Sequence, residues 1–282
     1  MPDHAFVVSA AGVRMPGILY GTAWKQERTA ALVEQAIAAG FRGIDTACQP
    51  KHYDEAGVGR GIAAACANSG VARAELYLQT KFTPLNGHDP QRIPYDPRAG
   101  LAEQVAQSFA VSLRNLQTDY LDGLVLHSPL ADREQLLEVW QAMESLVAAG
   151  QVRQLGISNC YDFALFEYLF QTATVKPAVI QNRFYADTGY DKPIRAFCRQ
   201  RQIVYQSFWT LTANPRVLAH PALTGPASAY GRTPAQIFFR YLHQQGVVPL
   251  TGTSSEQHMR EDLAIFEFAL DADECAAISA LF

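Results

Sequence analysis

The chain has 282 residues, of which 49% are hydrophobic and 18% are charged, and its formal net charge is −4. The basic residues are scattered and form no stripe, which argues against a nucleic-acid-binding protein. No apolar run approaches the roughly 18 residues of a membrane span. Residues 1–6 have no basic segment leading into an apolar stretch, so we expect no secretory signal and a cytoplasmic protein.

The cysteines give no sign of a disulfide framework or of a metal site. There are five of them, an odd number, with no CxxC pair and no neighbouring cluster of histidines. We therefore expect reduced thiols, as is usual in the cytoplasm, and no bound metal.

Short apolar runs alternate with amphipathic stretches along the whole chain, which is typical of repeated βα units. Helical periods are clearest over 27–40, 55–70 and 133–150. No GxGxxG follows a strand, which disfavours an open dinucleotide-binding sheet. By its length alone the chain could form two domains, but an eight-stranded barrel of about 250 residues is one domain. We predict an α/β protein, one (β/α)8 TIM barrel domain over residues 1–282. Strands are expected at 17–21, 42–47, 76–81, 123–128, 154–159, 178–184, 203–208 and 247–252.

Polar residues stand at the carboxyl ends of six predicted strands, where the apolar runs stop. Active sites of such barrels lie at this end, in loops that follow the strands. One polar residue there is often a structural cap, but six at one mouth favour a functional site. They are Asp45, Lys81, His127, Asn159, Gln181 and Ser207.

An ordered series of motifs extends over nearly the whole chain. Asp45, Tyr53, Lys81 and His127 occur in the contexts GIDTA, KHYDE, LYLQTKF and LVLHSP. GISN at 156–159, AVIQNRF at 178–184 and GTSSEQHMRED at 252–262 continue the series, which resembles that of the aldo-keto reductases. The resemblance implies reversible, NAD(P)H-dependent reduction of aldehydes and ketones to alcohols. It also implies that the segment 4–16 is a β-hairpin that caps the bottom of the barrel.

The resemblance gives each member of the tetrad a role. Tyr53 is then the general acid of reduction, and a nearby Lys81 ammonium is expected to lower the pKa of its phenol. Asp45 pairs with the lysine, and His127 hydrogen-bonds the carbonyl oxygen of the substrate. The loop DTACQPKHYDE is longer than the family pattern, and Asp54 stands where the family has Asn. His52 is therefore the alternative to Tyr53 as the acid.

The resemblance also implies a set of cofactor-binding residues. Ser158, Asn159 and Gln181 correspond to the groups that bind the nicotinamide carboxamide, and Gln206 replaces a tyrosine that stacks on the ring. At the adenosine end, Gly252 and His258 stand where the family has a Lys and an Arg that hold a 2′-phosphate. We therefore expect NADP(H) to be favoured and NAD(H) to be possible. The other expected contacts are Gly21, Thr22, Ala23, Asp45, Ser207, Phe208, Thr253, Ser254 and Asp262.

The expected substrate is a small carbonyl compound or alcohol, and the expected protein is a monomer or a weak homodimer. The predicted substrate walls are Trp24, Tyr53, Phe82, His127 and Trp209. The long connection over 83–100 is expected to rim the site. Two other functions remain open: a cofactor-binding regulatory or redox-sensing subunit, and a Schiff-base lyase that uses Lys81.

Overall fold

The computed structural model describes residues 5–282 and forms a closed barrel of eight parallel strands. Each strand pairs with the next along the chain, and the last strand closes the barrel by pairing with the first, Leu250 opposite Leu19. The strands are β3 (Leu19–Gly21), β4 (Gly43–Asp45), β5 (Tyr77–Phe82), β6 (Gly123–Leu126), β7 (Leu155–Ser158), β8 (Val179–Arg183), β9 (Val204–Phe208) and β10 (Val247–Thr251). All eight predicted strands are therefore confirmed.

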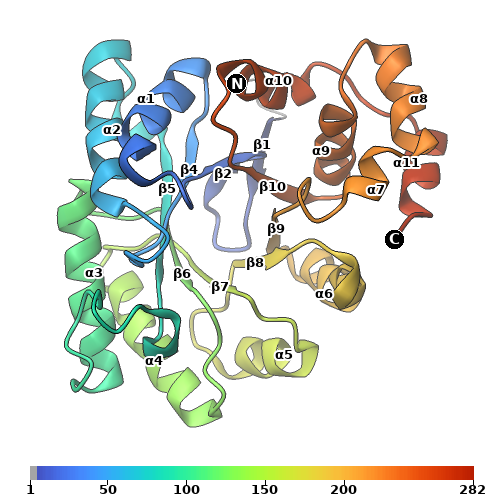
Figure 1. Cartoon of the computed structure of the whole chain (residues 1–282). Helices are drawn as coiled ribbons and strands as arrows, with labels where there is room; N and C mark the ends of the chain where they lie inside the picture. Colours follow the sequence, from blue (N-terminus) through green and yellow to red (C-terminus); the bar gives the residue numbers. More distant parts are fainter. Residues whose placement is uncertain (1–4) are drawn as a thin grey trace.

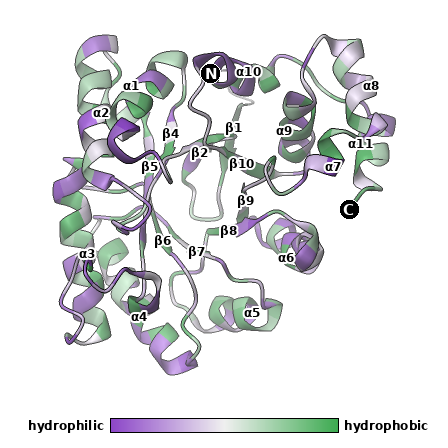
Figure 2. Cartoon of the chain, viewed as in Figure 1, coloured by the Kyte–Doolittle hydropathy of each residue, from purple (hydrophilic) through white to green (hydrophobic). Residues whose placement is uncertain are grey.

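Helices surround the strands as an outer ring (Figure 1). Hydrophobic and hydrophilic residues alternate around these helices, as expected for helices that bury one face against the barrel (Figure 2). The helices are α1 (Thr29–Ala39), α2 (Glu55–Ser69), α3 (Leu101–Leu116), α4 (Arg133–Ala148), α5 (Phe163–Thr172), α6 (Lys192–Arg201), α7 (Pro215–Leu218), α8 (Pro221–Tyr230), α9 (Pro234–Gln244), α10 (Glu256–Leu263) and α11 (Ala272–Ser279).

Local sequence signals set the ends of the helices. Asp54 begins α2, because its carboxylate accepts a hydrogen bond of 2.8 Å from the Gly57 N–H, one of the unpaired donors of the first turn. Gly70 ends the same helix in the left-handed conformation, at φ 69°, which glycine adopts without a steric cost. The altered loop before α2 therefore still delivers a regular helix start.

A two-stranded hairpin closes the amino-terminal end of the barrel. β1 (Phe6–Val8) and β2 (Arg14–Pro16) pair antiparallel, as predicted, and only residue 4 of the expected hairpin lies outside the described residues. Met15 is fully buried in a cluster with Tyr77, Val179 and Val204, which are the first residues of their strands. The hairpin thus acts as the floor of the barrel.

The connection over 83–100 packs beside the barrel, away from the main cavity. The side chains of His88 and Tyr95 each reach the carbonyl oxygen of Thr83, at 2.9 Å. None of the segment's residues lines the large cavity at the carboxyl ends of the strands, so the expectation that it rims the site is not met. Within residues 5–282, no helix is long and apolar enough to cross a membrane, and no group of three or more candidate metal ligands occurs.

Helices α2 and α3 approach so closely that glycine is required at one position. A Cβ atom built on Gly59 would overlap the carbonyl oxygen of Asn115. We predict that Gly59→Ala lowers the free energy of unfolding by about 1–3 kcal/mol, the usual cost of overpacking, although alanine favours helices. Urea denaturation measures this change.

Gly100→Ala is the matched control. A Cβ atom on Gly100 would meet no atom within 4 Å, and the residue is exposed at the start of α3 with a φ of −60°. Its cost should stay below about 1 kcal/mol. Equal losses in the two variants would contradict the packing argument.

Candidate active site

A cavity of about 650 Å³ opens at the carboxyl ends of the strands. Its volume is within the range of small-molecule and cofactor sites. Residues from several strand ends and loops meet in it, as the barrel prediction required. The predicted site residues that line the cavity are Gly21, Ala23, Trp24, Asp45, Tyr53, His127, Ser158, Asn159, Gln181, Phe208, Trp209, Gly252 and Thr253.

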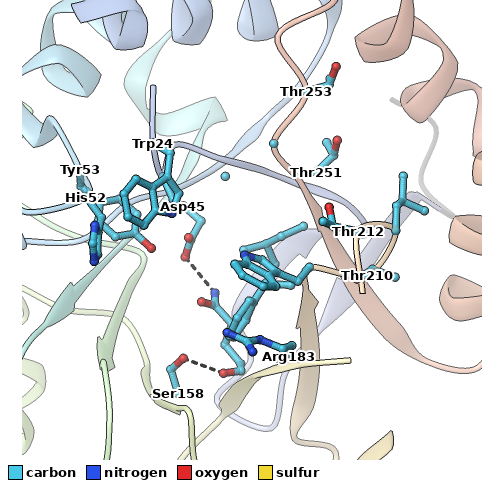
Figure 3. A pocket seen from close by; sticks show the side chains of 18 of the residues that line it. Trp24, Asp45, His52, Tyr53, Ser158, Arg183, Thr210, Thr212, Thr251 and Thr253 are labelled. Carbon is cyan, nitrogen blue, oxygen red and sulfur yellow. Dashed lines mark hydrogen bonds between the residues drawn. The ribbon is translucent and has the colours of Figure 1, made fainter. Parts of the chain in front are cut away.

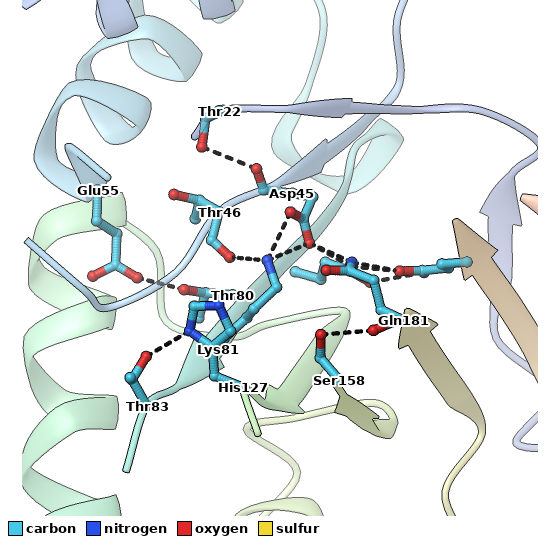
Figure 4. Close-up of polar contacts among 12 residues, drawn as sticks. Thr22, Asp45, Thr46, Glu55, Thr80, Lys81, Thr83, His127, Ser158 and Gln181 are labelled. Atoms are coloured by element: carbon cyan, nitrogen blue, oxygen red, sulfur yellow. Dashed lines mark hydrogen bonds and ion pairs between the residues drawn. The ribbon is translucent and has the colours of Figure 1, made fainter. Parts of the chain in front are cut away.

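A buried ion pair lies at the base of the cavity (Figure 4). The Lys81 ammonium donates to both carboxylate oxygens of Asp45, at 2.8 and 2.7 Å, and to the carbonyl oxygen of Thr46 at 2.8 Å. The lysine side chain is only 1% exposed. Burial lowers the pKa of Lys81, and the charge of Asp45 opposes that shift. All three N–H donors of the ammonium are thus engaged by the protein.

Tyr53 lies next to this ion pair and next to His127. The Lys81 nitrogen is 5.3 Å from the centre of the Tyr53 ring, and the Tyr53 and His127 rings are 6.0 Å apart. Burial and the negative charge of Asp45 raise the pKa of the Tyr53 phenol. The expectation that Lys81 lowers this pKa was wrong for the protein alone, because the lysine charge is matched by the Asp45 carboxylate and the phenol is desolvated. The phenol therefore stays protonated.

His127 is held in one orientation from below. Its Nδ1 lies 2.7 Å from the Thr83 hydroxyl, and its pKa falls well below the ordinary value through burial and the nearby Lys81 charge. A neutral imidazole that accepts a hydrogen bond from Thr83 at Nδ1 carries its own proton on Nε2. In that tautomer, Nε2–H is a donor directed away from Thr83.

His52 lies at the rim, apart from the ion pair. Its ring packs at a tilt of 37° against the Trp24 ring, with centroids 3.9 Å apart, and Trp24 is 60% exposed. Trp24, His52 and Tyr53 lie together on one side of the cavity, facing Arg183 on the other (Figure 3). Of the two residues considered as the acid, Tyr53 is the one that lies near both Lys81 and His127.

Three polar side chains at the ends of the adjacent strands β7 and β8 line one part of the cavity. The Ser158 hydroxyl donates to the Gln181 carbonyl oxygen at 2.7 Å, and the Asn159 amide donates to the His127 carbonyl oxygen at 2.8 Å. The Gln181 amide nitrogen donates to Asp45 at 2.9 Å. Within residues 5–282, no hydrogen bond uses the side-chain oxygen of Gln181, which leaves it available to accept one from a bound amide.

Comparison with known proteins identifies the family. The model of the Aldo/keto reductase family matches residues 12–282. The chain belongs to this family. A crystal structure of an aldo/keto reductase from Brucella melitensis superposes with a TM-score of 0.82 at 28% identity, covering 98% of this chain and 99% of that one. The relationship confirms the barrel fold and makes the protein an oxidoreductase.

Curated relatives agree with this assignment. The Bacillus subtilis protein called "Uncharacterized oxidoreductase YtbE" is 30% identical over 96% of this chain and 90% of its own length. A glyoxal reductase from the same organism is 32% identical over 88% of this chain and 82% of its own. The morphine 6-dehydrogenase of Pseudomonas putida is 31% identical over 96% and 88% of the two chains.

Below the ion pair, this aldo/keto reductase has a cluster of three glutamine amides inside the barrel. Gln79 donates to Asp45 at 2.6 Å and to Gln206 at 2.8 Å, and Gln206 donates back to Gln79 at 3.0 Å. Gln181 also donates to Gln206, at 2.8 Å. Gln206 is fully buried and does not line the cavity, so its predicted place at the cofactor surface is not observed. Its side chain instead supports Gln181 and, through Gln79, Asp45.

Several other predicted residues lie behind the cavity wall. Phe82 follows Lys81 on β5, so its side chain points to the opposite face of the strand, outside the barrel. There its ring packs against that of Tyr95, with centroids 5.7 Å apart. Phe82 is therefore not a wall of the substrate site. Thr22 is fully buried and donates to the Asp45 carbonyl oxygen at 2.9 Å. Ser207 is fully buried and accepts from Thr210 at 2.9 Å.

The predicted adenosine end is open and short of positive charge. Thr253 lines the cavity, and its hydroxyl is 3.5 Å from the His258 ring, whereas Ser254, His258 and Asp262 lie outside the cavity lining. Burial raises the pKa of Asp262 to about 7. Lys25, which the sequence reasoning missed, lines the cavity and donates to the Gly252 carbonyl oxygen.

Gln79 and Arg183 were also missed, although the two-residue period of a strand identifies both. Gln79 lies two residues before Lys81, and Arg183 lies two residues after Gln181, so each shares the inward face of a predicted site residue. Gln154, at the bottom of the barrel, was missed for a different reason, because it precedes β7 and, among the described residues, its side chain bonds to Tyr77 and Ser9. Reading strand faces, rather than strand ends alone, would have recovered the first two.

We predict that Gln79→Leu reduces kcat for carbonyl reduction by about tenfold, because a hydrogen bond to a charged group is worth roughly 1.5–3 kcal/mol. The variant removes one of the donors that hold the Asp45 carboxylate under Lys81. Steady-state kinetics measure the change, with cofactor affinity as a second reading.

Gln154→Leu is the matched control. It removes a buried amide of the same hydrogen-bonded chain that bonds to Tyr77 and Ser9 but not to Asp45. It should lower the free energy of unfolding but leave kcat within about twofold of the wild type. That limit corresponds to a change of less than about 0.5 kcal/mol in the activation free energy. An equal loss of kcat in both variants would mean that general loosening of the barrel causes the effect.

Proposed function

We propose that the chain catalyses the reversible NAD(P)H-dependent reduction of aldehydes and ketones, with Tyr53 as the general acid. The observation that supports this most is that the Tyr53 ring lies beside both the Lys81–Asp45 pair and His127, at the wall of the cavity. A phenol, an ammonium and an imidazole there can stabilise the negative charge that develops on a carbonyl oxygen, and the phenol can donate a proton to it.

The residues of the cavity fit a nicotinamide. The side chains of Ser158, Asn159 and Gln181 have hydroxyl and amide groups, which include both hydrogen-bond donors and acceptors. They therefore match the N–H donors and the carbonyl acceptor of a carboxamide. When bound, the reduced cofactor supplies a hydride to the carbonyl carbon. The role of the three side chains is to fix which face of the ring is presented to the substrate.

The proton is delivered by the protein. His127, neutral and oriented by Thr83, is positioned to donate from Nε2 to the carbonyl oxygen and so to place it near Tyr53. As hydride adds, the oxygen becomes an alkoxide, which is a stronger base than a phenolate. Tyr53 then gives up its proton even though burial raises its pKa. The charge left on the phenolate is stabilised by the Lys81 ammonium, 5.3 Å from its ring.

The geometry disfavours the Schiff-base alternative. A nucleophilic amine must be neutral and reach the substrate, but Lys81 is 1% exposed and its donors are taken by Asp45 and Thr46. The regulatory alternative predicts cofactor binding without turnover, so an aldehyde assay separates it from the proposal.

For the cofactor, we propose that NADP(H) is favoured with NAD(H) also used. Thr253, the start of α10 and Lys25 are the groups that support phosphate binding. Arg260 is engaged in an ion pair with Glu256 on the same helix. The substrates in the names of two relatives, glyoxal and morphine, differ greatly in size, which supports a carbonyl or alcohol substrate without fixing one. The five free thiols support a cytoplasmic location.

Replacement of the proposed acid gives the main test. Tyr53→Phe should lower kcat by about a hundredfold or more, the scale of a lost general acid, while the dissociation constant of the cofactor changes little. His52→Ala is the matched control, because it removes a neighbouring ring that packs against Trp24 at the rim, and its effect should be mild. If the His52 variant loses more activity than the Tyr53 variant, the assignment of the acid is reversed.

Cofactor choice gives an independent test at the other end of the cavity. His258→Ala should weaken NADP+ binding by about threefold to tenfold, the value of one modest contact, with NAD+ binding unchanged. The reason is that His258 lies beside Thr253, at 3.5 Å, where the extra phosphate would bind. Fluorescence titration of both cofactors measures the ratio, and a large NADP+ preference that survives the change would assign the phosphate to Lys25.

A further inference from the structure

Arg183 presents a cation to the cavity without a hydrogen-bond acceptor of its own. It ends β8 and lines the cavity, and its guanidinium lies 4.1 Å from the centre of the Trp209 ring and 5.2 Å from that of Tyr185. Its Nε is buried without a partner, and within residues 5–282 neither a hydrogen bond nor an ion pair of the guanidinium to a side chain or carbonyl oxygen is found. The group is held by aromatic faces alone.

The remaining charges of the cavity do not neutralise Arg183. Asp45 lines the cavity, but its carboxylate is matched by Lys81 and accepts from Gln79 and Gln181 as well. Lys25, the other cation of the lining, is directed to the Gly252 carbonyl oxygen. Among the described residues, the wall around Arg183 therefore carries a net positive charge.

The position of Arg183 relates it to the reacting end of the cavity. It is two residues beyond Gln181 on the same strand face, about 7 Å further toward the mouth at the usual rise of a strand. Figure 3 shows it across the cavity from Tyr53 and His52, and far from Thr253 at the adenosine end. Arg183 and the proposed catalytic residues thus line the same cavity, where one bound substrate can meet both.

We propose that Arg183 is a specificity-determining residue that binds the carboxylate of an anionic carbonyl substrate, so that the enzyme prefers aldehydes and ketones that carry a carboxylate. This inference rests on the proposed function and specifies its substrate class. Two properties of arginine support it. Stacking on Trp209 leaves the edge N–H groups of the planar guanidinium unused, and these match the two oxygens of a carboxylate.

The test compares two nearly isosteric substrates, 4-carboxybenzaldehyde and 4-formylbenzamide, which differ mainly in charge. The wild-type enzyme should show a kcat/KM about tenfold or more higher for the carboxylate, the value of one charge-assisted contact. Arg183→Met should reduce this ratio to about one, mainly through KM of the carboxylate, while kcat/KM for the amide stays within about threefold.

Arg216→Met is the matched control. Arg216 is exposed on α7, outside the cavity lining, so its loss changes the net charge by the same amount. It should leave the ratio of the two substrates as in the wild type. A reduced ratio in this variant would assign the preference to the overall field of the protein and overturn the proposal.

Other results also decide the question. A wild-type ratio near one, or an equal loss for both substrates in Arg183→Met, would overturn the proposal. A rise in the dissociation constant of NADP+ in that variant, with an unchanged ratio, would assign the guanidinium to a cofactor phosphate instead. If the wild type reduces neither aldehyde, the proposed function fails. In that case the binding of benzoate against benzamide, followed by tryptophan fluorescence, still tests the site, because Trp209 lies against the guanidinium.

Discussion

The structure depends on one buried ion pair. Removing a lysine and an aspartate from water costs several kcal/mol for each ion, and their mutual attraction offsets that cost only when the remaining polar groups are satisfied. Lys81 meets this condition with Asp45 and Thr46, and the Asp45 Oδ1 also accepts from the amides of Gln79 and Gln181. The polar interior of the barrel below the cavity follows from the presence of this pair.

This constraint makes the inside of the barrel unusual in composition. Barrel interiors are commonly filled by branched apolar residues, whereas here amides and a phenol fill the layers beneath the proposed catalytic residues. Tyr77 donates to Gln79 at 2.9 Å, Gln154 donates to Tyr77 at 2.9 Å, and Ser9 of the hairpin donates to Gln154 at 2.6 Å. Each of these four side chains has a partner, which is the condition under which such a network adds rigidity.

The sequence predicted the architecture, and it singled out the candidate site residues, because both leave short-range signals. Strand positions follow from apolar runs, and residues such as Asp45 and Lys81 stand out as charges at the ends of such runs. Phe82 was misplaced because strand alternation was not applied beyond Lys81. The pKa of Tyr53 could not be predicted, since its direction depends on how completely Asp45 neutralises Lys81 and on how far the phenol is buried. The burial of Gln206 depends on its neighbours from other strands, Gln79 and Gln181, which no local pattern reveals.

The hydrogen-bonded chain through the barrel has a consequence for assembly. Its members come from the first hairpin, from β5 and from β9, so residues as far apart as Ser9 and Gln206 belong to one connected network. A nascent or truncated chain that lacks β9 leaves Gln79 without its reciprocal amide and the Asp45 carboxylate less firmly fixed. Catalytic competence is then acquired late in folding, when nearly the whole barrel has closed. Recovery of turnover after dilution from denaturant would therefore trail the recovery of helical circular dichroism.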